Sequence, residues 1–206
     1  MPRKKPWNKG RTVGQSRPLN PDQVDLIRLM FDQRTNPKST RDLALFNLAL
    51  DSQLRGCDLV ALKVRDVSSP EHGVHEVVTL RQQKVTEGVT FHLSERTRVS
   101  LERWIIASNK VGASWLFTGL TRGKDRAISV EQFRRLVKEW VSSAGLDATH
   151  YTPHSLRRTQ ATYIYRETGN LRAAQLLLGH KNIQNTVRYL GIDKADALEI
   201  AKKYHL

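Results

Sequence analysis

The sequence predicts a single, mainly α-helical domain with a small antiparallel β-sheet. Apolar residues recur at helical spacing over most of the 206 residues, and capping residues precede most of these segments. Only residues 74–93 change to the valine- and threonine-rich pattern that is typical of strands. This length allows one full hydrophobic core, and no linker indicates a second folded domain.

The chain begins with a strongly basic segment. Its first seventeen residues contain six basic residues and no acidic one, with prolines and glycines among them. We expect residues 1–19 to form a flexible basic arm. No apolar run follows this positive start, and no stretch is apolar enough to span a bilayer, so we expect a cytoplasmic protein. Two interpretations of the arm stay equally open: a solubilising tail, or a segment that binds DNA phosphates through Arg3, Lys4, Lys5, Lys9 and Arg11.

Helices are predicted for the residues that follow the arm. Asn20 and Pro21 provide an N-cap and a proline at the first helical position. Apolar residues then recur on one face of two successive segments, and Arg55-Gly56 interrupt the pattern. The single cysteine, Cys57, excludes an internal disulfide, and we expect it to be a small buried residue. The expected helices are Asp22–Gln33, Ser39–Gln53 and Cys57–Leu62.

A β-hairpin is predicted in the middle of the chain. Val74–Leu80 and Val89–Leu93 favour strands, and Lys84 lies at or near the turn between them. The helical period then returns, with Ser94 and Ser129 as N-caps of helices that end near Ser108 and Ser143. Between these helices we expect a short buried segment at Trp115–Phe117.

The last quarter of the chain is predicted to be helical throughout. Thr152, Asn170 and Asn182 are N-cap residues, and Gly169 and Gly179 are suited to end helices. The expected helices are Pro153–Gly169, Leu171–Leu178, one from Asn182 to Tyr189 or Leu190, and a tail helix within residues 193–206.

The charge balance indicates a polyanionic partner. The sequence has 34 Lys and Arg against 20 Asp and Glu, a formal net charge of +14. A domain this basic attracts polyanions, of which nucleic acid is the commonest. Ribosomal proteins, membrane-surface binders and architectural DNA proteins share this property, so charge alone does not identify the function.

The segment Thr152-Pro153-His154-Ser155-Leu156-Arg157 predicts an anion site at a helix N-terminus. With Thr152 as the cap, His154 and Arg157 are three residues apart and share one face of the helix. Free N–H groups and the positive end of the helix dipole lie at the same place. A segment of this kind, taken alone, is more often a capped helix start with a surface histidine and a surface arginine than an anion site.

The order of several polar residues along the chain narrows the choice of function. Arg55 is followed by Lys84, then by His154-x-x-Arg157, then by Gly179-His180, with Tyr189 nine residues later. This ordered set resembles the tyrosine recombinase (phage integrase) family over about residues 20 to 195. The resemblance implies the catalytic-domain fold of that family, and site-specific DNA cleavage and rejoining.

The resemblance also implies a role for each residue. Tyr189 would attack a DNA phosphodiester and form a 3′-phosphotyrosyl link, while Arg55 and Arg157 hold the non-bridging oxygens. His154 would assist proton transfer from Tyr189, and His180 would donate to a non-bridging oxygen. No cofactor and no metal are implied.

Two of the implied roles have alternatives. Lys84 would protonate the leaving 5′-oxygen, although Lys63 and Arg81 lie nearby in the sequence. Asp58 would orient a catalytic side chain, or it is a solvent-exposed acid on a helix.

Most members of the family carry a separate N-terminal helical domain, and only the basic arm precedes the first predicted helix here. The chain is similar in this to the short recombinases that invert fimbrial promoter switches. We therefore expect a catalytic domain at residues 20–206 that acts in the nucleoid on double-stranded DNA. We further expect a homo-tetramer on paired sites, with an accessory DNA-bending protein as a possible partner and no membrane association. The competing functions are type IB topoisomerase-like DNA relaxation and a non-catalytic DNA-binding regulator.

Overall fold

The computed structural model describes residues 16–34, 36–81, 88–120 and 126–191, together with residues 198 and 202. The described part is mainly helical with two small antiparallel sheets, in agreement with the predicted fold class. Its helices contain no stretch with the length and apolar character that a bilayer demands. In chain order the elements are α1 (Pro21–Asp32), α2 (Pro37–Ser52), α3 (Gly56–Val60), η1 (Val64–Asp66), β1 (Ser68–Ser69), β2 (Gly73–Val74), β3 (Val77–Arg81), β4 (Gly88–His92), α4 (Glu95–Ala107), α5 (Val130–Ser143), η2 (Ala148–His150), α6 (Pro153–Thr168), α7 (Leu171–Leu177) and α8 (Ile183–Leu190).

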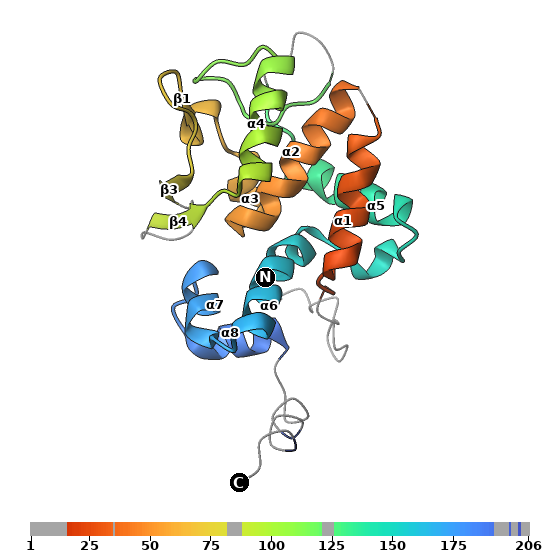
Figure 1. Ribbon diagram of the computed structural model, residues 1–206, viewed down its shortest axis with the longest axis vertical. Coiled ribbons are helices and arrows are strands. Elements are labelled where there is room, and N and C mark those ends of the chain that lie inside the picture. Colours follow the sequence, from red (N-terminus) through yellow and green to blue (C-terminus); the bar gives the residue numbers. More distant parts are fainter. Residues whose placement is uncertain are drawn as a thin grey trace, which may run out of the picture.

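Helix α2 lies at the centre of the molecule, with α1, α4 and α6 packed around it (Figure 1). The sequence predicted one apolar face for this helix, yet every residue from Ala44 to Leu50 is buried. The neighbouring helices therefore depend on α2 for their packing.

Helix α2 begins at Pro37, two residues before the predicted start, because the side chain of Asn36 accepts a hydrogen bond from the N–H of Ser39.

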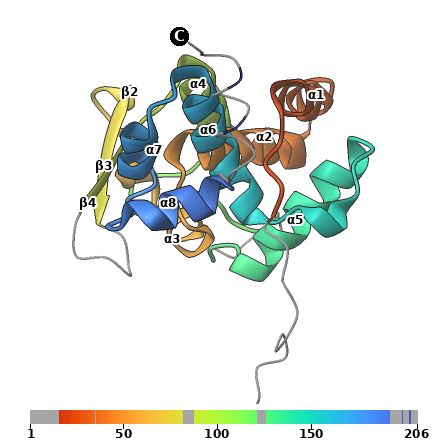
Figure 2. The same ribbon diagram turned by 90° about the horizontal axis from the view of Figure 1, so that it is seen from below.

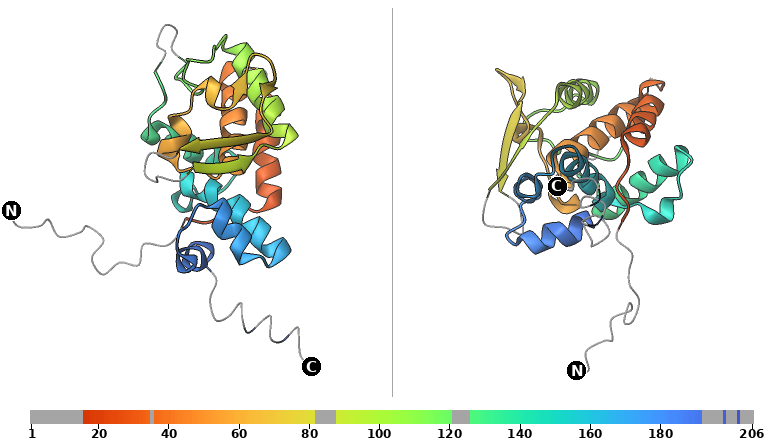
Figure 3. Two further views of the ribbon diagram at one scale, coloured as in Figure 1. Left: turned by 90° about the vertical axis from the view of Figure 1, so that its left-hand side faces the viewer. Right: turned by 60° about the horizontal axis from the view of Figure 1, so that its bottom comes forward.

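The two sheets are separate hairpins on one side of the molecule (Figure 3). Strands β3 and β4 pair antiparallel, with Val78 opposite Phe91 on the buried face. The prediction of one strand over Val74–Leu80 was wrong at its start, because Val74 pairs with Ser68 in the β1–β2 hairpin instead. The predicted turn residue Lys84 lies outside the described residues. Residues 81 and 88, which bracket it in the sequence, are paired in the β3–β4 register.

The packed part of the chain starts earlier than the boundary at residue 20 that the sequence predicts. Leu19 is buried in the main core, and its N–H donates to Oγ1 of Thr159 on α6 at 2.9 Å. The N–H of Arg17 donates to the carbonyl of His150 at 3.0 Å. Residues 16–19 therefore lie along the start of α6, whereas residues 1–15 of the predicted arm lie outside the described residues.

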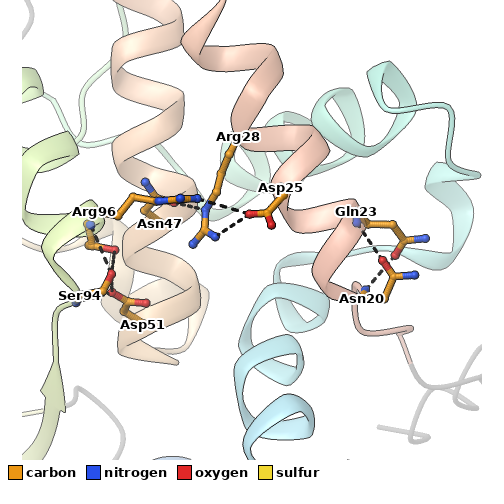
Figure 4. A network of polar contacts seen from close by, with 9 residues as sticks. Asn20, Gln23, Asp25, Arg28, Asn47, Asp51, Ser94 and Arg96 are labelled. Carbon is orange, nitrogen blue, oxygen red and sulfur yellow. Dashed lines mark hydrogen bonds and ion pairs between the residues drawn. The ribbon is translucent and has the colours of Figure 1, made fainter.

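A polar network connects α1 to α2 and α4 (Figure 4). Arg28 donates to Asn47 of α2 at 2.9 Å and to Asp25 of α1 at 3.3 Å. Asp25 also accepts from Arg96 in the first turn of α4 at 3.4 Å. The exposed ion pair between Asp25 and Arg96 stabilises the fold by little, whereas the hydrogen bond from Arg28 reaches the fully buried Asn47.

In Figure 1, helices α6, α7 and α8 gather below α2 and the β3–β4 hairpin, on the side of the molecule that faces the viewer in Figure 2. Helices α7 and α8 pack on α6 through a second, small hydrophobic cluster, which is separate from the main core and contains Ala161, Ala174, Leu178 and Leu190. Tyr189 packs against the edge of this cluster. The C-terminal helical unit therefore depends on few apolar contacts.

The main core contains a buried ion pair. Arg41 donates to Oδ1 of Asp42 at 2.7 Å and 2.9 Å, and both side chains are almost fully buried. Trp140 of α5 donates through its ring nitrogen to Oδ2 of Asp42 at 3.0 Å. Its ring meets Phe31 and Phe46 edge to face. The carboxylate thus joins α2 to α5, although burial raises the pKa of Asp42.

We expect Asp42→Ala to lower the free energy of unfolding by about 3–5 kcal/mol, because it leaves the Arg41 guanidinium buried and uncompensated. Urea denaturation followed by circular dichroism measures this change. The matched control is Asp32→Ala, an exposed position at the end of α1, which we expect to change it by less than about 0.5 kcal/mol. Equal effects of the two substitutions would contradict the assigned role of Asp42.

Candidate active site

The N-terminus of α6 is built as the sequence predicts. Oγ1 of Thr152 accepts from the N–H of His154 at 3.2 Å, and the N–H of Thr152 donates to Ser155 at 3.1 Å. Pro153 occupies the first helical position. His154 is exposed at this helix end, while Arg157 one turn later is 3% exposed. Both side chains lie where the helix dipole favours an anion.

Arg157 links α6 to the end of α7. Its Nη2 donates to the carbonyl of Leu178 at 2.5 Å. Within the described ranges its Nη1 is buried and has no hydrogen-bond partner. Burial lowers the pKa of Arg157, and the nearby Tyr189, followed by the carboxylate of Asp58, opposes this shift. The fixed guanidinium therefore keeps a donor available for an anionic ligand.

The turn between α2 and α3 brings Arg55 to the same place. Gln53 adopts a left-handed conformation with φ of 49°, which ends α2 and reverses the chain. Gly56 lies against the start of α6, since a Cβ added to it would stand 3.7 Å from Cβ of Pro153. The charge of Arg55 acts on His154, Arg157, His180 and Tyr189. Asp58 follows on α3 and is buried, so the interpretation as a solvent-exposed acid was wrong.

His180 is held at the turn between α7 and α8. Gly179 adopts φ of +61° there, which favours glycine. Nδ1 of His180 lies 3.1 Å from Oγ1 of the fully buried Thr186, and the side chain of Gln175 donates to the His180 carbonyl at 2.8 Å. Burial, and then the charges of Arg157 and Arg55, lower the pKa of His180 to about 4. Its imidazole is therefore neutral at pH 7.

Tyr189 completes the site from the last turn of α8. Its hydroxyl donates to the carbonyl of His154 at 3.4 Å, and its ring meets the ring of His180 edge to face at 5.2 Å. The guanidinium of Arg158 lies 5.5 Å from the centre of the tyrosine ring. Burial raises the pKa of Tyr189 to about 12, against the opposing charges of Arg157 and Arg158. The hydroxyl is therefore protonated at neutral pH.

The structure brings together five of the six predicted catalytic residues: Arg55, His154, Arg157, His180 and Tyr189. The sixth, Lys84, and the arm residues lie outside the described part of the chain. The sequence analysis missed Gln175, Thr186 and Arg158, which contact the predicted residues directly. Only Arg158 had a possible signal, since it follows Arg157 in the sequence. Cys57, predicted to be buried, is only half-buried.

Solved structures that match this fold include recombinases and integrases. The XerA recombinase matches with a TM-score of 0.73 at 20% identity, covering 94% of this chain and 66% of that one. The XerH site-specific recombinase bound to its palindromic difH substrate gives the same TM-score and identity, covering 95% and 55%. The catalytic domain of bacteriophage HP1 integrase matches with a TM-score of 0.58 at 19% identity, covering 93% and 96%. The fold is therefore that of a tyrosine recombinase catalytic domain.

The model of the phage integrase family matches residues 18–196, and the chain belongs to this family. The tyrosine recombinase XerC of Shewanella sp. (strain W3-18-1) is 28% identical over 184 residues, covering 87% of this chain and 58% of the relative. XerC of Corynebacterium efficiens is 29% identical over 173 residues, covering 83% and 53%. The chain thus spans little more than half the length of these relatives.

We expect His180 to remain neutral between pH 5.5 and 8, because burial and two arginines lower its pKa to about 4. NMR of histidine labelled in the ring with ¹⁵N measures this titration. Removal of one positive charge by Arg55→Gln should move the pKa of His180 upward, whereas Arg166→Gln, an exposed position on the same helix as Arg157, should not. A His180 midpoint near 6.5 in the wild type would contradict the described environment.

Proposed function

We propose that the chain is a site-specific recombinase that cleaves and rejoins double-stranded DNA through a covalent 3′-phosphotyrosyl link at Tyr189. One observation carries the proposal. The Tyr189 hydroxyl lies against the first turn of α6, the helix end that also presents His154 and Arg157. A nucleophile and the groups suited to bind a phosphate thus meet within one chain, which supports cleavage by each protomer in its own site.

The proposed reaction is a transesterification at phosphorus. The phenolic oxygen of Tyr189 forms a bond to the phosphorus atom, and the bond from phosphorus to the 5′-oxygen breaks. The 3′ end becomes a phosphotyrosyl ester and the other end a free 5′-hydroxyl. The ester keeps the energy of the broken bond, so attack by a 5′-hydroxyl rejoins the strand without an external energy source.

The charges around the site suit this reaction. Arg55 and Arg157 would bind the non-bridging oxygens, where negative charge grows in the transition state. A neutral His180 can donate one hydrogen bond to the same phosphate. Although His154 is exposed at the helix end, its imidazole is partly desolvated, and this desolvation and the charge of Arg157 lower the pKa of His154; it is therefore neutral at pH 7 and can accept the tyrosine proton. Asp58 would hold Arg157 in position, since the two are close enough to interact.

We assign protonation of the leaving 5′-oxygen to Lys84. The described parts of the hairpin support this choice, because a Cβ added to Gly179 would stand 3.5 Å from Val89 of β4. The β3–β4 hairpin, whose strands flank Lys84 in the sequence, therefore lies beside the turn that holds His180. The competing Lys63 is used elsewhere: its ammonium lies 5.1 Å from the centre of the Trp115 ring.

The remaining expectations concern the assembly. Exchange of both strands between two duplexes needs four cleavages, which supports a homo-tetramer with one Tyr189 for each strand. The basic residues of the arm, Arg3 to Arg11, would add phosphate contacts. The tail that the sequence predicts to be helical, residues 193–206, lies outside the described residues except for Leu198 and Lys202. We further propose that this tail packs on a neighbouring protomer, and the apolar side chain of Leu198, which is 63% exposed, supports this role. We also propose that the protein acts on DNA in the nucleoid and that an accessory DNA-bending protein takes part.

The Tyr189→Phe variant tests the nucleophile. Cells that express the wild type or the variant are lysed in detergent, protein attached covalently to DNA is collected, and the attached fragments are sequenced. We expect wild-type adducts at one or a few recurring sequences, and no adducts with Tyr189→Phe. Tyr163→Phe, a change at an exposed tyrosine of α6, is the matched control and should retain the adducts.

Other outcomes of this experiment would reject the proposal. Wild-type adducts spread evenly over the genome would indicate a DNA-relaxing topoisomerase. DNA binding by the wild type without adducts, even on nicked substrates that prevent rejoining, would indicate a non-catalytic regulator. Adducts that persist in Tyr189→Phe would place the nucleophile elsewhere.

We expect Lys84→Ala to slow cleavage by ~10²–10⁴-fold, because the 5′-oxygen would have to leave as an alkoxide. A substrate with sulfur in place of the bridging 5′-oxygen has a leaving group that needs no proton. Lys84→Ala should therefore cleave this substrate at a rate close to that of the wild type. Lys63→Ala is the control. If the sulfur-containing substrate restored the cleavage rate of Lys63→Ala and not that of Lys84→Ala, the general acid would be Lys63.

A further inference from the structure

Arg158 is a buried arginine beside the proposed nucleophile, and the resemblance to the family assigns it no role. Its side chain is 6% exposed, and burial lowers the pKa of Arg158. A buried guanidinium requires compensating contacts. The structure provides two: Nη1 donates to the carbonyl of Ser16 at 2.7 Å, and the guanidinium carbon lies 5.5 Å from the centre of the Tyr189 ring. Arg158 therefore connects the start of the packed chain to the nucleophile.

The Ser16 carbonyl is itself held in place. Oγ of Ser16 lies 2.8 Å from Oγ1 of Thr152, the residue that caps α6. The backbone bonds of Arg17 and Leu19 fix the next residues against the start of α6. Residues 16–19 thus form a support for the Arg158 guanidinium, and this support is joined to the helix that presents His154 and Arg157.

We propose that Arg158 is a positioning residue that orients the Tyr189 ring and favours its phenolate form during attack, while the Ser16 carbonyl fixes the guanidinium. A cation near an aromatic ring is attracted to the electrons of the ring. When the phenol loses its proton in the transition state, the ring becomes more negative and the attraction grows. An interaction that is stronger in the transition state than in the ground state accelerates the reaction.

This inference rests on the proposed function, because it requires Tyr189 to be the nucleophile. The Nη1 of Arg158 already donates to the Ser16 carbonyl, whereas the Nη1 of Arg157 has no hydrogen-bond partner in the described structure, so Arg157 is the better placed of the two to bind the phosphate. The expected effect of Arg158 is therefore on the cleavage rate and not on the affinity for DNA. The charge of Arg158 also opposes the effect of burial, which raises the pKa of Tyr189.

Single-turnover cleavage of a nicked duplex that contains the recovered recombination site tests the role. We expect Arg158→Met to lower the rate by about 10- to 30-fold, the equivalent of a desolvated cation–π contact. Arg158→Lys keeps the charge and should recover part of this loss, while DNA affinity stays unchanged in both variants. Arg166→Met removes a charge from an exposed position of the same helix and should cleave at the wild-type rate.

A more acidic tyrosine separates this role from a merely structural one. Incorporation of 3-fluorotyrosine at position 189 makes the phenolate easier to form, so it should restore most of the rate lost in Arg158→Met. Thermal melting shows whether that variant is folded, and Arg158→Lys with the same fluorotyrosine replaces it if it is not.

Two results would overturn the proposal for Arg158: a wild-type rate in Arg158→Met, or no rescue by fluorotyrosine in a folded variant. Absence of a covalent adduct in the wild-type protein would instead reject the proposed function. The failure of the inference and the failure of the function are therefore distinguishable.

Discussion

The hydrogen bond from Arg157 to the Leu178 carbonyl is the interaction on which the rest of the site depends. Helices α7 and α8 pack on α6 through a small cluster that is separate from the main core. The bond therefore fixes the turn that carries His180, and through α8 the position of Tyr189. Among the described residues, the Nη1 of the same guanidinium has no hydrogen-bond partner, so one side chain both assembles the site and is suited to bind its anion.

Electrostatics and burial act together on the titratable groups of the site. Burial and the arginine charges both lower the pKa of His180, because each disfavours a second positive charge. For Tyr189 the two effects oppose each other, and burial dominates. The site thus combines charged arginines with neutral histidines and a protonated phenol. Such an arrangement is suited to bind a phosphate first and to move protons afterwards.

Local patterns in the sequence predicted much of the fold, and particular failures show where such patterns end. The capped start of α6 and the glycine turn before His180 depend on residues within one or two turns of chain, and both were confirmed. The strand over Val74–Leu80 failed because strands are defined by their partners, and Val74 pairs with Ser68. The burial of α2 on all its faces also depends on three other helices, and the residue pattern of α2 alone does not predict their positions.

The sequence by itself determined the helix caps, the mainly helical class and the order of Arg55, His154, Arg157, His180 and Tyr189. These features follow from residue type and short spacing. Only the tertiary structure decided that Asp58 is buried near Arg157, that Lys63 lies over Trp115, and that Arg158 joins Ser16 to Tyr189. The physical reason is sequence separation. Ser16 and Arg158 are 142 positions apart, and a contact over that distance exists only after residues 16–19 have packed against α6.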